Sequence, residues 1–495
     1  MNILLATSEA VPFAKTGGLA DVCGALPVEL ARGGRRAAVI LPCYTQARQC
    51  GLPLDDTGVE LSIPIGSKTV RGRILRSHLP DGDVPVYLVE QDEYFRRAGL
   101  YGEDGRDYID NCERYVFFCR AVLEAIRLLE LPVDVLHAND WQTGLIPAYL
   151  KIEYRGVPGY EHIGSLFTIH NMAYQGQFWH WEMLLTGLDW KYFNWQQMEF
   201  FGHLNLMKTG LVFADALNTV SPRYAQEIQT PEFGCGLEGV LTQRRDALCG
   251  IINGVDYREW DPEIDPHLAR TYTAQTAAAG KAECKAALQQ QMGLTVSPRT
   301  PLLAFVGRLV EQKGIDLIAS VMQNWLDENV QWVVLGTGEP KYHQLFQQLS
   351  AQHPGRISAR LEFSNPLAHR IEAGADLFLM PSRYEPCGLN QLYSLRYGTP
   401  PVVRATGGLS DTIVDANEAT LAAGTATGFV LEEHTSQALS LALRRALDLY
   451  AQEKSWSRLI GTGMRQDWSW RRSAEDYTRL YQRIASGTRR AVAHA

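Results

Sequence analysis

The chain has 495 residues, of which 46% are apolar and 21% charged, so it can fill more than one hydrophobic core. Its 47 basic and 55 acidic residues leave a net charge of −8, which argues against a nucleic-acid partner held by overall charge. No apolar run approaches the ~18 residues of a membrane span, so no membrane partner is expected.

The N-terminus is predicted to be a β-strand rather than a signal peptide. It has no basic lead-in, and Glu9 follows the first short apolar run. The nine cysteines are scattered without a Cys-x-x-Cys pair, and Cys112 and Cys119 are spaced to pack on one helix face. An unpatterned set of this kind is typical of a reducing compartment, so we expect a cytoplasmic protein.

Near-continuous apolar runs alternate with helical patterns along the whole chain, which is typical of parallel sheets covered on both faces. In the first half the predicted strands are Ile3–Thr7, Ala37–Leu41, Val84–Val89, Val133–Leu136, Leu166–Ile169 and Ala216–Val220. In the second half they are Leu302–Val306, Trp332–Leu335, Leu377–Met380, Pro401–Arg404 and Phe429–Leu431.

Two such series predict an α/β protein with two Rossmann-like, doubly wound domains. The turn signal Asn253-Gly254 lies near the expected hinge. We place the N-terminal domain at 1–250, the C-terminal domain at 251–467, and a final helix with a short tail at 468–495.

A hexapeptide pattern occurs once in each half. Thr16-Gly17-Gly18-Leu19-Ala20-Asp21 is matched by Thr406-Gly407-Gly408-Leu409-Ser410-Asp411, and each follows a predicted strand and precedes a predicted helix. Parallel sheets place ligand loops at the carboxyl ends of strands. Adjacent glycines allow close approach of a ligand, and a helix N-terminus favours an anion. A Gly-Gly pair alone is more often a plain turn, but the repeated setting favours a ligand loop.

Four segments, the first of which contains the N-terminal hexapeptide, carry recognisable motifs. They are Lys15–Asp21, His170–Gly176, Gly307-Arg308-Leu309 followed by Gln312-Lys313-Gly314, and Arg383–Gln391. Together they resemble the ADP-glucose-dependent glycogen and starch synthase family of retaining glycosyltransferases, over nearly the whole chain. The resemblance implies the GT-B architecture, with two domains facing across a cleft that holds the active site and a C-terminal helix that crosses back to the first domain. It also implies an ADP-glucose donor, an α-1,4-glucan or glycogen acceptor extended at its non-reducing end, and no cofactor.

Transfer from a sugar nucleotide builds negative charge on the departing diphosphate, which fixed cations can stabilise. Arg308 and Lys313 are five apart in a strand-to-helix loop, so both can converge on one diphosphate. The alternative is two surface cations on a solvated loop. The resemblance favours the catalytic role and adds Lys15 as a donor contact from the other domain, together with Gly17 and Gly18.

The resemblance places Glu385 at the glucose ring. We expect it to provide electrostatic and hydrogen-bonding support rather than covalent attack, because a front-face route with the leaving phosphate as base suits the cation cluster better. Two loops are expected to contact the donor. Their contacting residues are Cys387, Gly388, Leu389 and Asn390 in the first and Thr406, Gly407 and Gly408 in the second.

His170 ends a predicted buried strand, where a histidine is often merely structural. The resemblance makes it catalytic, at the reacting sugar. It also makes Asp140 and Trp141 acceptor or sugar contacts and places Asp21 and Asn253 in the cleft. Asn139 and Gln142 depart from the family, in which many members carry His, and this puts the fine acceptor geometry in question.

Phe363 stands where the family stacks the adenine ring, often on a tyrosine, and the alternative is a core aromatic. No metal site is expected. The one Asp-x-Asp motif, Asp81-Gly82-Asp83, follows a proline directly before a strand and is first a turn signature.

Four other functions fit parts of the sequence. A dehydrogenase would need Gly-x-Gly-x-x-Gly, which Gly336-Thr337-Gly338 only begins. A non-catalytic glucan-binding protein would use some of the eleven tryptophans but not a diphosphate cluster. A related enzyme using UDP-glucose, or one that only hydrolyses the donor, would carry similar loops.

Overall fold

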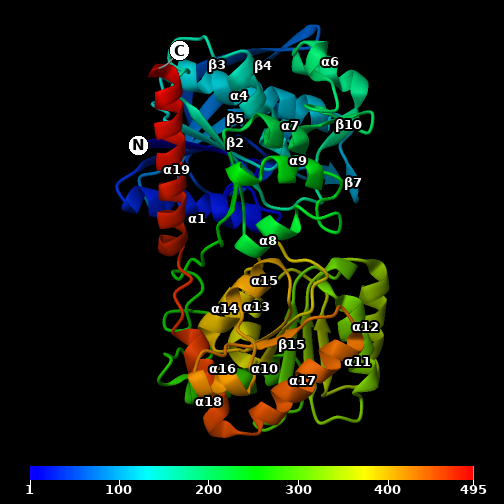
Figure 1. Ribbon diagram of the computed structural model, residues 1–495. Helices are drawn as coiled ribbons and strands as arrows, with labels where there is room; N and C mark the ends of the chain where they lie inside the picture. The colour runs from blue at the N-terminus through cyan, green and yellow to red at the C-terminus, as the bar shows by residue number, and fades with distance from the viewer. Residues whose placement is uncertain (494–495) are drawn as a thin grey trace. The chain divides into compact units, whose positions relative to one another are not determined.

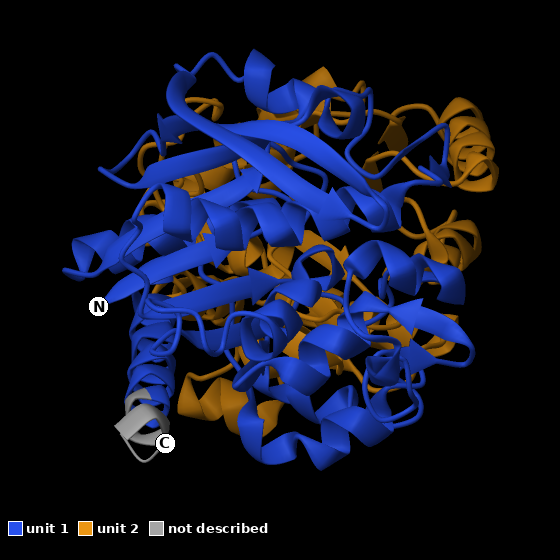
Figure 2. Ribbon diagram, turned by 90° about the horizontal axis from the view of Figure 1, so that it is seen from above, with its two compact units in different colours: residues 1–254, 470–495 blue, residues 255–469 orange. Residues whose placement is uncertain are grey.

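The computed structural model describes residues 1–493, and it divides into two compact units (Figures 1 and 2). Unit 1 is Met1–Gly254 with the C-terminal Trp470–Ala495, and unit 2 is Val255–Ser469. Residues 494–495 of the expected tail lie outside the described part. Among the described helices none is long and apolar enough to cross a membrane.

Unit 1 is built on a nine-stranded sheet in the order β14-β13-β9-β8-β1-β2-β5-β4-β3. The strands from β14 to β5 run parallel, and β4 and β3 form an antiparallel hairpin at one edge. The strand bounds are β1 Asn2–Ala6, β2 Arg36–Pro42, β3 Asp55–Ile65, β4 Lys68–His78, β5 Pro85–Glu90, β8 Val135–Asn139, β9 Gly164–Ile169, β13 Ala216–Thr219 and β14 Leu248–Gly250. Its main helices are α1 Gly18–Arg32, α4 Asn111–Leu128, α5 Leu145–Ile152, α7 Leu206–Phe213, α8 Pro222–Glu227, α9 Glu238–Gln243 and α19 Trp470–Ala493.

The last helix, α19, belongs to the core of unit 1 (Figure 2). Its Tyr477 and Tyr481 are fully buried and pack with α1 against β1. The hydroxyl of Tyr481 lies 2.8 Å from His137 Nδ1, and Asn218 Nδ2 donates to the Tyr477 hydroxyl at 3.1 Å. Because these tyrosines close one face of the sheet, unit 1 is built from both ends of the chain.

Unit 2 has a six-stranded, fully parallel sheet in the order β17-β16-β15-β18-β19-β20. The strand bounds are β15 Leu302–Val306, β16 Gln331–Leu335, β17 Ile357–Arg360, β18 Leu377–Met380, β19 Pro401–Arg404 and β20 Phe429–Leu431. Its helices are α10 Ala277–Gln291, α11 Ile315–Asn324, α12 Pro340–Gln352, α13 Asn365–Gly374, α14 Asn390–Tyr397, α15 Gly407–Thr412, α16 Glu418–Ala423, α17 Ser436–Tyr450 and α18 Glu453–Met464.

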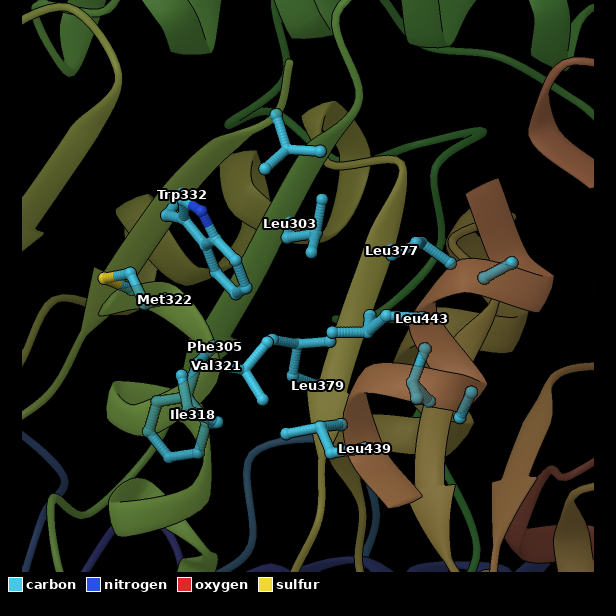
Figure 3. Packing of buried hydrophobic residues seen from close by; sticks show 14 of the residues in the cluster. Leu303, Phe305, Ile318, Val321, Met322, Trp332, Leu377, Leu379, Leu439 and Leu443 are labelled. Atoms are coloured by element: carbon cyan, nitrogen blue, oxygen red, sulfur yellow. The ribbon is translucent and has the colours of Figure 1, made fainter. Parts of the chain in front are cut away.

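The side chains of β15 alternate between two cores, as the period of two in a strand requires. Leu303 and Phe305 pack with α11 and α17 on one face (Figure 3). Leu302 and Ala304 pack with α10 and α13 on the other. Burial on both faces explains why this strand is apolar throughout, and the predicted α/β fold class is confirmed in both units.

The strands that the sequence pattern missed lie at or next to sheet edges. β3 and β4 form the hairpin of unit 1, and β14 and β17 close edges of the two sheets. Outer faces of such strands meet solvent, so their sequences carry polar residues and lack a continuous apolar run. The expectation of a purely parallel first sheet was therefore wrong at this one edge.

Candidate functional site

Both sheets have a switch point, where neighbouring parallel strands continue into connections on opposite sides. In unit 1 it lies between β1 and β8, and in unit 2 between β15 and β18. Ligands in α/β folds bind beyond the carboxyl ends of strands at such points. The loops after these four strands hold most of the predicted site residues.

In unit 2 the structure brings Lys313 and Glu385 into direct contact. Lys313 lies in the 3-10 turn Glu311–Lys313 before α11, and its Nζ is 2.6 Å from Glu385 Oε2. Ser382 Oγ donates to the same carboxylate oxygen at 3.0 Å, and Glu385 is buried. A lysine and a carboxylate so placed give the site a fixed charge pair at the switch point.

Arg308 lies on the loop directly after β15, with its side chain exposed. Two glycines allow that loop to sit where it does. A Cβ at Gly336 would lie 1.8 Å from the carbonyl oxygen of Gly307, and one at Gly338 would lie 2.2 Å from that of Leu309. The Gly336-Thr337-Gly338 segment thus supports the arginine loop, and it has no need of a dinucleotide to explain its glycines.

The second Gly-Gly pair packs against the Glu385 loop. A Cβ at Gly407 would lie 1.9 Å from the carbonyl oxygen of Glu385, and one at Gly408 would lie 2.0 Å from that of Cys387. The amide of Gly408 donates to the Glu385 carbonyl at 3.2 Å, and Thr406 is buried at the start of α15. The close approach that these glycines permit is therefore between two protein loops, and the predicted donor contacts of Thr406, Gly407 and Gly408 stay a prediction.

The remaining residues of the Glu385 loop lead into α14. Gly388 has φ +72°, and Gln391 Nε2 donates to the carbonyls of Cys387 and Gly388. Asn390 Nδ2 donates to the Val306 carbonyl at 2.8 Å, which ties this loop to the end of β15. Leu389 is partly exposed at the helix start, whereas the Cys387 thiol is buried.

In unit 1 the first Gly-Gly loop surrounds a buried carboxylate that sequence reasoning missed. Glu9 accepts hydrogen bonds from the amide of Gly17 at 3.2 Å, the hydroxyl of Thr16 at 2.6 Å and the hydroxyl of Tyr101 at 2.6 Å. The N-terminus of α1, expected to receive a ligand anion, is thus occupied by an anion of the protein itself. The signal for it was a carboxylate three residues after the end of β1 and seven residues before Thr16.

Lys15 and Asp21 form an exposed ion pair, with Nζ 2.6 Å from Oδ1. A Cβ at Gly17 would meet nothing within 4 Å, so this loop is open on its outer side, and Gly18 begins α1. The Lys15 ammonium carries three N–H donors and is half exposed, so it can contact a phosphate while it stays paired with Asp21.

Asp140 sits in a strained turn after β8. Its φ of +57° is rarely adopted by non-glycine residues, and such outliers cluster at functional sites. Its Oδ1 accepts from the amide of His170 at 2.7 Å. Burial raises the pKa of Asp140 to about 7, and the nearby Glu9 carboxylate contributes to the rise. The next residue, Trp141, is largely buried against Tyr115.

His170 is held by the residue that departs from the family pattern. Asn139 Nδ2 donates to the carbonyls of Ala6 and His137, so its Oδ1 faces His170 Nε2 at 3.0 Å. Burial lowers the pKa of His170 to about 3, so the ring is neutral near pH 7. Nε2 therefore carries the proton, and Nδ1 is left as an acceptor.

We expect Asn139→Ala to lower kcat roughly 10- to 100-fold, because His170 loses the partner that fixes its ring and tautomer. Asn139→Asp keeps an acceptor but adds a charge that raises the pKa of His170 above its value of about 3. That variant should lose activity as the pH falls through the raised pKa of His170, in addition to the change near pH 7 that Asp140 gives in the wild type and the variant alike. Profiles of kcat/KM from pH 5 to 9 measure the pH dependence of Asn139→Asp. A wild-type kcat in Asn139→Ala would contradict the proposed role of Asn139 in positioning His170.

The other predicted residues lie apart from these contacts. Asn253 is buried in the loop after β14, and no described residue hydrogen-bonds to its Oδ1. Phe363 is 84% exposed between β17 and α13, which rules out the core alternative. Asp81-Gly82-Asp83 is an exposed turn between β4 and β5. Within residues 1–493 no group of three or more His, Cys, Asp or Glu side chains is arranged around a metal position.

Known proteins match the chain along its length. Residues 2–243 match the starch synthase catalytic domain, and residues 292–459 match glycosyl transferases group 1. A glycogen synthase of Rhodopirellula baltica is 49% identical over 99% of each chain, and glycogen synthase 2 of Nitrosococcus oceani is 48% identical over 98% of each.

Solved structures extend the likeness to the fold. The catalytic domain of starch synthase IV from Arabidopsis thaliana, bound to ADP and acarbose, has a TM-score of 0.90 and 32% identity, covering 98% of this chain and 99% of that one. Sucrose-phosphate synthase from Thermosynechococcus elongatus, at 18% identity and a TM-score of 0.58, shares the fold alone.

Proposed function

Because the chain belongs to the glycogen and starch synthase family of glycosyltransferases, we propose that it transfers glucose from ADP-glucose to the non-reducing end of an α-1,4-glucan with retention. The resemblance drawn from the motifs is confirmed, and with it the glycosyltransferase class. The dehydrogenase alternative is excluded by the same matches.

The observation that carries the proposal is the charge cluster at the switch point of unit 2. Lys313 is paired with Glu385, and Arg308 lies five residues before Lys313 on the same loop. As the bond between the sugar and ADP breaks, negative charge grows on the departing oxygen, and Arg308 and Lys313 stabilise it. Lys15 is proposed as a further donor contact.

The acceptor hydroxyl attacks the anomeric carbon from the face that ADP leaves, and its proton passes to the departing phosphate. Glu385 supports the developing positive charge of the ring and binds its hydroxyls. Neutral His170 offers Nδ1 and its backbone carbonyl to the reacting sugar. Asp140 binds a hydroxyl of the sugar or of the acceptor by a hydrogen bond.

One experiment tests the proposal against its alternatives. The protein is incubated with glucose-labelled ADP-glucose, with and without glycogen, and ADP release and label in glycogen are both measured. Transfer releases ADP and also labels glycogen. Hydrolysis releases ADP but leaves glycogen unlabelled, and a non-catalytic binder gives neither product. A UDP-glucose arm tests the donor base, and activity should survive EDTA because the cations of the chain meet the diphosphate.

Phe363→Ala should raise the KM for ADP-glucose about 2- to 12-fold, because one stacking contact contributes roughly 0.5–1.5 kcal/mol. Its ring is 84% exposed, so the variant should fold as the wild type does. Phe201, 82% exposed in unit 1, is the matched control, and Phe201→Ala should leave this KM unchanged. If Phe363→Ala and Phe201→Ala have the same KM for ADP-glucose, Phe363 does not stack on the adenine ring.

A further inference from the structure

Five aromatic rings gather on the surface of unit 1, in the segment that includes β10 (Gln177–Trp179) and α6 (Met183–Thr186), both labelled in Figure 1. We call Trp179, His180, Trp181, Trp190 and Phe193 the aromatic patch. The three tryptophans are 59%, 50% and 42% exposed in chain order. Large exposed aromatic clusters mark interaction sites.

The rings of the aromatic patch contact one another. Trp181 and Trp190 have centroids 5.6 Å apart, and Trp190 and Phe193 have centroids 5.0 Å apart. His180 lies 5.3 Å from Trp179 and 5.2 Å from Trp181. The result is one continuous array of ring faces and edges.

Buried cations hold the backbone that displays this array. Lys208 Nζ donates to the carbonyls of Trp195 and Glu199, and Arg120 donates to that of Thr186. Both cations are less than 10% exposed. Inside α6, Met183 is fully buried. The rings are thus carried on an anchored segment, and a ligand does not have to order it on binding.

The aromatic patch continues toward a predicted acceptor residue. Phe178, the neighbour of Trp179 in β10, has its ring 5.8 Å from that of Trp141. A Cβ at Gly176 would lie 2.3 Å from the Trp141 ring, so only glycine lets this strand pass so close. The same strand therefore packs on Trp141 at one end and carries Trp179 into solvent at the other.

We propose that the aromatic patch is a second α-glucan site, which binds a more distant part of the acceptor chain while its end is extended. A pyranose ring has C–H faces that pack on aromatic rings and hydroxyls that need hydrogen-bonding partners. The patch supplies both: its three tryptophans carry indole N–H donors, the His180 ring contacts those of Trp179 and Trp181, and exposed Lys191 follows Trp190 in the sequence. This inference deepens the proposed function and rests on it for the identity of the polymer.

The test is migration of the donor-free protein through native gels with and without glycogen. The double variant Trp179→Ala/Trp181→Ala should lose about fivefold or more of the apparent glycogen affinity. Trp195→Ala removes a tryptophan that is 74% exposed in the same segment but outside the aromatic patch, and it should migrate as the wild type. In transfer assays the KM for glycogen should rise more than the KM for maltotriose.

Equal retardation of the double variant and the wild type would overturn the proposal, as would an equal loss in Trp195→Ala. A patch covered by a second copy of the chain would appear as a fall in mass in light scattering of the double variant, and that result would also overturn it. The gel measures binding without donor, so its outcome is independent of whether glucose transfer from ADP-glucose is observed.

A wild-type measurement covers the case in which the double variant does not fold. Hydroxyl-radical footprinting with and without glycogen should protect Trp179 and Trp181 from oxidation at least about threefold more than Trp195. Equal oxidation with and without glycogen at the two patch tryptophans would refute the second site.

Discussion

Arg308→Ala and Lys313→Ala should each lower kcat at least about 100-fold, since removing one preorganised donor to developing charge typically costs on the order of 10²–10³ in rate. The effect should fall on kcat more than on the KM for ADP-glucose, because the charge they meet grows as the bond breaks. The double variant should lose less than the product of the single losses, because both cations act on one diphosphate.

Conservative variants and controls sharpen this test. Arg308→Lys should recover activity only in part, because a point charge does not reproduce the guanidinium fork. Lys15→Ala should affect donor KM more than kcat. Arg444, an exposed arginine paired with Glu328 at 2.8 Å, is the matched control, and Arg444→Ala should keep full activity. Full activity in either alanine variant of the pair would assign leaving-group stabilisation to other residues.

Glu385→Gln should lower kcat about 100-fold or more. The amide keeps the shape of the carboxylate and a hydrogen-bond acceptor for Ser382 and Lys313, but it removes the negative charge that supports the reacting ring. Because Lys313 loses its ion-pair partner, the measurement should include the thermal midpoint beside kcat. Glu328→Gln, at a partly exposed glutamate paired with Arg444 at 2.8 Å and outside both catalytic loops, is the control and should leave kcat unchanged.

Chemical rescue distinguishes support from covalent attack. Glu385→Ala should not regain activity with azide, because in a front-face route no enzyme carboxylate attacks the anomeric carbon. Recovery of turnover with formation of a glucosyl azide of opposite anomeric configuration would show that Glu385 is the nucleophile, and the proposed route would then be wrong.

The strands that are buried on both faces could be predicted from the sequence alone. Leu302–Val306, Leu377–Met380, Pro401–Arg404 and Phe429–Leu431 were predicted with the bounds that the structure has, because a strand covered on both faces is apolar at nearly every position; Arg404, at the end of its strand, is the one charged residue among them. The motifs also predicted that Arg308, Lys313 and Glu385 lie on loops after strands. This prediction used only the positions of these residues in the sequence.

Tertiary structure alone decided which groups meet. The hairpin of β3 and β4 joins the first sheet at its edge, where half the side chains face water and the apolar signal disappears. The pairing of Lys313 with Glu385, 72 residues apart, depends on β15 and β18 lying side by side. Glu9 binds the Gly17 loop, and Asn139 fixes the His170 ring, through contacts that no local pattern encodes. The physical reason is common to all: a periodic sequence records which faces are buried, whereas hydrogen bonds between distant loops depend on the order of strands in the sheet.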